Sequence, residues 1–172
     1  MRTDGFRFLI FGLIVVFLQV VILNNIQFLG FVNPYLYVMV ILVLPVDVSK
    51  HQILLFGFFL GLVIDLFSST IGLHTSAALL IAFLRFFLLK YLAPRDGFEF
   101  SSRPSISEMG LPWFISYSGI LILAHHFFLF SLESLKFSEL GQILIRTFSS
   151  AAFTLLLVIA VEYLRYRRKV RS

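Results

Sequence analysis

Asp65 is the residue whose type and position offer most chemistry, because it lies inside an apolar stretch of the chain. An ionisable group in a membrane span costs roughly 2.5–3.5 kcal/mol and is retained near an interface, a partner or a cavity. Gly57 and Gly61 precede Asp65 at intervals of four residues, so the three share one stripe of a helix. A Gly-x-x-x-Gly pair lets a second helix approach closely. The stripe predicts either a docking face for a partner helix or a seam packed inside the protein.

Other polar side chains fall at a similar depth to Asp65 if their helices alternate in direction. His74 follows the turn after Asp65, and Arg146 lies about one turn inside the last apolar stretch. His125 and His126 are neighbours about 100° apart on a helix, so only one of them is expected to face inward. We expect Asp65, His74, His125 and Arg146 to form an outer-leaflet polar cluster. The alternative is that each group is satisfied separately near the interface, with Asp65 capping the turn at Ser68 and Ser69.

The sequence contains no recognisable catalytic, metal-binding or cofactor-binding pattern. Successive histidines lack the four-residue spacing of a His-Glu-x-x-His metal site, and there is no glycine-rich phosphate loop. The absence of cysteine excludes disulfides and thiolate chemistry. We therefore expect a protein that is not an enzyme and that holds neither a metal nor a cofactor.

Apolar stretches fill the chain, which is 59% hydrophobic and only 13% charged. A span needs about 20 residues to cross the hydrocarbon core of a bilayer as a helix. The sequence predicts one all-α integral membrane domain with six transmembrane helices, at 6–23, 31–46, 53–67, 73–92, 112–132 and 142–164. There is no room for a separate soluble domain.

Positive charge is distributed unequally between the two sides of the predicted bundle. With an internal N-terminus, the inner segments contain eleven basic residues and the outer loops contain one, Lys136. The inner residues are Arg2, Arg7, Lys50, Lys90, Arg95, Arg103, Arg165, Arg167, Arg168, Lys169 and Arg171. This bias places both termini in the cytoplasm. The net charge of +5 is accordingly topogenic, and we expect no nucleic-acid partner.

The predicted second span is short, because Pro34 to Val46 covers only about 20 Å as a helix. Omitting it would put the basic tail outside, against the charge bias, so we expect a span that is short, tilted or partly buried in protein. The basic residues Arg165, Arg167, Arg168, Lys169 and Arg171 of the tail 165–172 are expected to contact anionic lipid. Arg85 is expected to extend toward the cytoplasm, and Glu162 to pair with Arg165.

Two segments in the middle of the chain are separated by a short turn, Gly61-Leu-Val-Ile-Asp65-Leu-Phe and Gly72-Leu-His-Thr-Ser-Ala-Ala-Leu. In these segments the chain resembles the rod shape-determining protein MreD family. Asn33-Pro34 and Pro45 are also similar to the family, as are the size, the six spans and the basic tail. The turn departs from the pattern, since Ser68-Ser69-Thr70-Ile71 stands where a further Gly or Pro is typical.

The resemblance implies a scaffold subunit of the cell-elongation complex, which makes peptidoglycan, in the bacterial inner membrane. It implies direct binding to MreC and, through MreC, links to MreB, RodA and a penicillin-binding protein. We expect Gly57, Gly61 and Asp65 to be the docking stripe for MreC, because helices in lipid associate through close packing at small residues and polar contacts. It also implies a bundle like the substrate-binding S-component of energy-coupling-factor (ECF) transporters. The alternative function is a small-molecule-binding membrane component for vitamin or metal uptake, which needs an enclosed, polar outer pocket.

Reporter fusions test the predicted topology. A fusion near Ser138 should report a periplasmic location and one after Ser172 a cytoplasmic location, because of the charge bias. A periplasmic signal from the C-terminal fusion would contradict six crossings.

Overall fold

The computed structural model describes residues 2–26, 30–99, 102–134 and 139–170, with side chains for 5–26, 30–99, 102–134 and 139–165. The fold is all-α. Five of its helices are long and apolar enough to cross a membrane. They are α1 (Arg2–Val21), α3 (Lys50–Ser68), α4 (Leu73–Tyr91), α6 (Leu111–Ser134) and α7 (Leu140–Val170). Three short elements complete the chain, η1 (Leu23–Asn25), α2 (Val38–Leu42) and α5 (Ile106–Met109). The predicted spans 6–23, 53–67, 73–92, 112–132 and 142–164 coincide with the five long helices.

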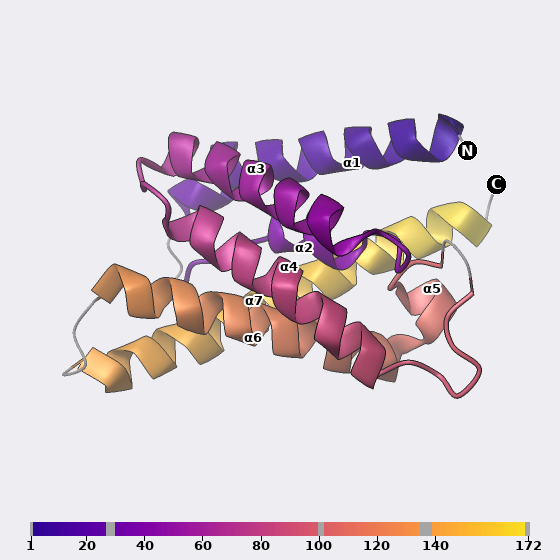
Figure 1. The fold of residues 1–172 in the computed structure, drawn as a ribbon. Helices are drawn as coiled ribbons and strands as arrows, with labels where there is room; N and C mark the ends of the chain where they lie inside the picture. The colour runs from indigo at the N-terminus through magenta and orange to yellow at the C-terminus, as the bar shows by residue number, and fades with distance from the viewer. Residues whose placement is uncertain (1, 27–29, 100–101, 135–138, 171–172) are drawn as a thin grey trace.

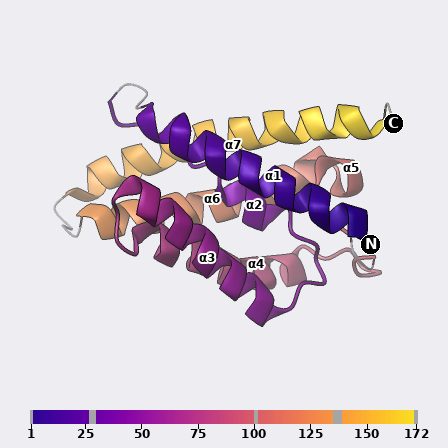
Figure 2. The ribbon, with the colours of Figure 1, turned by 90° about the horizontal axis from the view of Figure 1, so that it is seen from above.

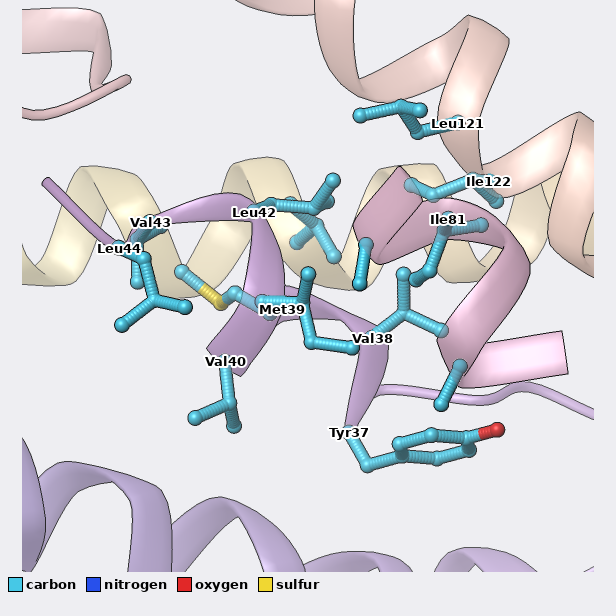
Figure 3. Close-up of a cluster of buried hydrophobic side chains, with 14 of the residues drawn as sticks. Tyr37, Val38, Met39, Val40, Leu42, Val43, Leu44, Ile81, Leu121 and Ile122 are labelled. Atoms are coloured by element: carbon cyan, nitrogen blue, oxygen red, sulfur yellow. The ribbon is translucent and has the colours of Figure 1, made fainter. Parts of the chain in front are cut away.

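The predicted helix 31–46 is wrong in length, because α2 has only five residues. Proline fixes φ and lacks an N–H, and Pro34 and Pro45 bound the stretch in which a helix can form. All residues from Leu36 to Leu44 are nevertheless buried, and Figure 3 shows this stretch within the hydrophobic core. Residues 36–44 of the second apolar stretch therefore lie inside the protein.

Helices α1 and α3 point in the same direction. The Asn24 side-chain amide, just after α1, donates to the Ser68 hydroxyl at the end of α3 over 2.9 Å. The chain between them must return to the opposite end, where the Val46 N–H donates to the Ser102 carbonyl at 2.9 Å. Residues 33–46, which we call the return segment, make this passage through the bundle interior. Figures 1 and 2 both show the two chain termini at one end of the bundle.

The glycine stripe of α3 faces α4. A Cβ atom added to Gly61 would overlap the Thr75 Cα and lie 2.8 Å from the His74 carbonyl oxygen. A Cβ added to Gly57 would lie 3.2 Å from the Ala78 carbonyl oxygen and from the Ala82 Cβ. The two helices are in contact along this seam because glycine has no side chain there. The prediction that MreC docks on Gly57, Gly61 and Asp65 is therefore wrong, because α4 of the same chain occupies that face.

Replacing Gly61 with alanine should destabilise the protein. The new methyl group meets backbone atoms of α4 that cannot rotate away, and overpacking of this kind costs about 1–3 kcal/mol or more. Gly119→Ala on α6 is the matched control, because the nearest atom to its added Cβ is 3.9 Å away. Membrane abundance and the melting temperature in detergent should fall for Gly61→Ala only. Equal values for the two variants would contradict the seam.

Candidate functional site

The Asp65 carboxylate caps the start of α4. One oxygen accepts hydrogen bonds from the His74 N–H at 3.0 Å and the Thr70 hydroxyl at 2.8 Å. The other accepts from the Thr75 N–H at 2.9 Å and the Thr75 hydroxyl at 2.6 Å. Four donors and the partial positive charge of a helix N-terminus stabilise a carboxylate that is only 4% exposed.

The turn before α4 explains why this cap comes from another helix. Gly72 precedes α4 with φ of 83° and has no side chain that could accept from the first helical N–H groups. Asp65 supplies that acceptor from α3. The hydroxyl groups that donate to it belong to Thr70 and Thr75, in place of the Ser68 and Ser69 named in the capping alternative. Ser69 itself has a left-handed φ of 55°, which usually favours glycine.

Tyr37 connects two of the predicted cluster residues, His74 and His125. Its hydroxyl lies 3.1 Å from His74 Nδ1 and 2.6 Å from His125 Nε2. Tyr37 and His125 are completely buried, and His74 is 4% exposed. His125 faces His74 through Tyr37, but His126 is also completely buried, so the expectation that only one of the two adjacent histidines faces inward is wrong.

The unpaired ring nitrogen of His125 indicates which groups donate in the two hydrogen bonds of the Tyr37 hydroxyl. His125 Nδ1 is buried without a partner, and a bare nitrogen lone pair costs less there than an unpaired N–H. His125 therefore carries its proton on Nε2 and donates to Tyr37, while Tyr37 donates to His74 Nδ1. All three groups are neutral in this arrangement.

His126 belongs to a second set of contacts on α7. Its Nε2 lies 3.1 Å from the Thr154 hydroxyl, and its Nδ1 lies 2.8 Å from the Ile122 carbonyl oxygen. The Tyr35 ring packs among all three histidines, with centroid distances of 5.0 Å to His74, 5.8 Å to His125 and 5.2 Å to His126. Aromatic rings thus fill the space between the polar groups of this site.

Arg146 has different partners. Its guanidinium donates to Glu133 at 3.1 Å and lies 4.3 Å from the centre of the Phe130 ring. No described hydrogen bond joins Arg146 to Asp65, His74 or His125. The predicted four-residue cluster is corrected accordingly, because Glu133 on α6 satisfies the arginine closer to the surface.

Arg85, expected to reach the cytoplasm, is instead 2% exposed. Its guanidinium donates to the Leu44 carbonyl, to the Pro45 carbonyl at 3.1 Å and to the Tyr117 hydroxyl at 2.9 Å. Tyr117 in turn donates to the Leu42 carbonyl at 3.0 Å. The arginine thus binds two carbonyls that follow α2, while Tyr117 binds the carbonyl of the last α2 residue, Leu42.

Further polar side chains satisfy the beginning of the return segment. The Gln19 amide donates to the Pro34 carbonyl at 3.1 Å, and its oxygen accepts from the Tyr37 N–H at 3.3 Å. Ser150 accepts from the Asn33 N–H and Thr154 from the Tyr35 N–H, each at 3.0 Å. The sequence analysis missed these roles of Gln19, Tyr37, Tyr117, Ser150 and Thr154. The sequence pattern that could have identified them is a polar side chain inside an apolar stretch, because a membrane span usually retains such a group for a partner or a function.

The basic tail is described only in part. Arg165 pairs with Glu162 at 2.8 Å, as expected, and lies 4.5 Å from the centre of the Phe11 ring. The side chains of Arg167, Arg168 and Lys169, and the whole of Arg171, lie outside the described residues. Lipid contact by the tail stays a prediction.

Within the described residues, no three His, Asp or Glu side chains are grouped as a metal site. Comparison with family models, with curated proteins and with solved structures finds no match for this chain.

Replacing Tyr37 with phenylalanine should lower the free energy of unfolding by about 1–3 kcal/mol. The change leaves His74 Nδ1 and His125 Nε2 buried without a partner. Tyr35→Phe is the matched control, because it keeps the ring among the histidines and removes a hydroxyl with no described hydrogen bond. Melting temperatures in detergent compare the two. An equal effect of both variants would mean that the Tyr37 hydroxyl contributes nothing specific.

Proposed function

We propose that this protein is a non-enzymatic scaffold subunit of the bacterial cell-elongation complex that binds MreC in the inner membrane. Through MreC it would connect to MreB, RodA and a penicillin-binding protein. The proposal starts from the family resemblance of the segments around Asp65 and Gly72. In the structure those segments form the α3–α4 hairpin, in which Asp65 caps α4 and Gly61 allows the two helices to pack closely.

The observation that carries the proposal is the filled interior of the polar site. Its hydrogen-bonding groups are engaged by Tyr37, Thr75 and Thr154 of the chain itself, and the Tyr35 ring occupies the centre. A solute-binding component needs an enclosed pocket there. Two cavities, of about 290 Å³ and 150 Å³, instead lie at the other end, near Lys50. This favours the scaffold over the vitamin or metal uptake component.

The proposal includes six crossings with both termini in the cytoplasm. The return segment would be the second crossing, with its irregular backbone shielded from lipid by the five long helices. Non-helical backbone at membrane depth is tolerated when it is buried in protein in this way. The end of the bundle that holds both termini would face the cytoplasm, in agreement with the charge bias.

Helix α1 offers the surface that we propose for MreC. Only 11% of its most apolar stretch is buried, against 33–44% in the other four long helices. It lies along the outside of the bundle in Figures 1 and 2. A helix that the bundle leaves mostly uncovered is free to pack against the single span of a partner.

Site-specific photo-crosslinking in cells tests both parts of the proposal. A photoreactive amino acid at Leu13 on α1 should capture MreC, because that side chain is 62% exposed and points away from the bundle. The matched control is Leu156 on α7, which is 64% exposed. Capture at Leu156 alone would move the partner surface to α7.

Co-purification with MreC and vitamin binding to the purified protein decide between the two functions. MreC in the purified complex and no saturable vitamin binding is the expected result. A bound vitamin together with no MreC, by crosslinking or co-purification, would overturn the scaffold in favour of uptake.

A further inference from the structure

Two adjoining cavities lie at the end of the bundle that holds the chain termini. The larger, of about 290 Å³, is bounded by the start of α3, the end of α4 and the segments around Val46 and Phe98. The smaller, of about 150 Å³, runs along the α3–α4 seam between Leu54, Phe83 and Phe87. Lys50, Ile53 and Phe86 line both of them, so the two cavities are adjacent and share these side chains, and we refer to them together as the groove.

The charged lining of the larger cavity is entirely cationic. Lys50, Lys90 and Arg85 line it, and no Asp or Glu does. Lys50 Nζ lies 3.7 Å from the centre of the Phe86 ring, and neither lysine forms an ion pair within the described residues. Arg85 is committed to the Leu44 and Pro45 carbonyls but adds its positive charge to the same space. An anion would find two lysines without a carboxylate partner there.

The remaining lining is apolar. Ile53, Leu89 and Phe86 surround the cations, and Phe83 and Phe87 continue the apolar wall along the outside of α4. Phe83 and Phe87 are each 51% exposed, on a surface that faces lipid if α4 crosses the membrane. A ligand with an anionic group and a long apolar chain fits this lining, in which the lysines of the larger cavity are followed by the phenylalanines of the smaller one.

We propose that this groove binds an anionic phospholipid of the inner leaflet. Its phosphate lies between Lys50 and Lys90, and an acyl chain follows the seam past Phe86 toward Phe83. Basic pockets between helices at the cytoplasmic surface are suited to anionic headgroups, and each nearby lysine adds about 1 kcal/mol. The bound lipid would extend from the start of α3 to the end of α4 and so hold the open end of the hairpin that Asp65 closes.

Native mass spectrometry of the full chain in detergent tests the site, with phosphatidylglycerol, phosphatidylcholine and soluble glycerol phosphate as probes. We expect retention of phosphatidylglycerol only. The double variant Lys50→Gln/Lys90→Gln should weaken its binding roughly 10- to 30-fold at low salt, from the loss of two lysines. Melting temperatures without lipid check that this variant is folded, and each single variant should give a smaller loss.

The control is Arg7→Gln/Arg103→Gln, which removes two charges from the same end of the bundle without changing the lining of either cavity. It should bind phosphatidylglycerol like the unchanged protein. Equal weakening by both double variants would reduce the site to general surface charge and overturn the proposal. Equal retention of phosphatidylcholine, or equal binding of glycerol phosphate, would also overturn it, because the first needs no anion site and the second no acyl groove. MreC is absent from this experiment, so its result is independent of the scaffold proposal.

Discussion

The fold depends on one constraint, that the backbone of the return segment must make all its hydrogen bonds without water. A five-residue helix satisfies few of its own terminal groups. Side chains from four long helices supply the missing partners, namely Gln19 of α1, Arg85 of α4, Tyr117 of α6, and Ser150 and Thr154 of α7. The segment thereby joins these helices more specifically than apolar contact could.

The two buried charges next to α4 are stabilised in different ways. Asp65 of α3 lies at the N-terminal N–H groups of α4, whose partial positive charge stabilises it. Arg85 of α4 binds the Leu44 and Pro45 carbonyls, which follow α2. Both charges form several directed hydrogen bonds. Ion pairing across the bundle is unnecessary, and the two residues fix opposite ends of α4 independently. This arrangement explains why an arginine close enough to the surface to reach water stays in the interior.

The sequence predicted the features that depend on local pattern. Five helices follow from length and hydropathy, and the pairing of His74 with one of two adjacent histidines follows from helix geometry and depth. Three features depended on partners distant in sequence. They are the packing of the Gly57–Gly61 stripe on α4, the pairing of Arg146 with Glu133, and the hydrogen bonds of Tyr37 to His74 and His125. These contacts depend on how the helices are rotated relative to one another, which hydropathy does not encode. A charge count could predict that the chain returns between α1 and α3. It could not predict that the return segment passes through the interior of the bundle.

A filled polar interior has consequences for how such a protein could act. Tyr37, His74 and His125 lie in the middle of the polar site, and their hydrogen bonds join the return segment to α4 and α6. Opening that site would expose several unpaired polar groups to an apolar surrounding, each at a cost of about 1–3 kcal/mol. Such an interior favours one conformation over alternation between two. A rigid bundle with one largely uncovered helix is consistent with the scaffold that we propose, which positions a partner and does not move a substrate.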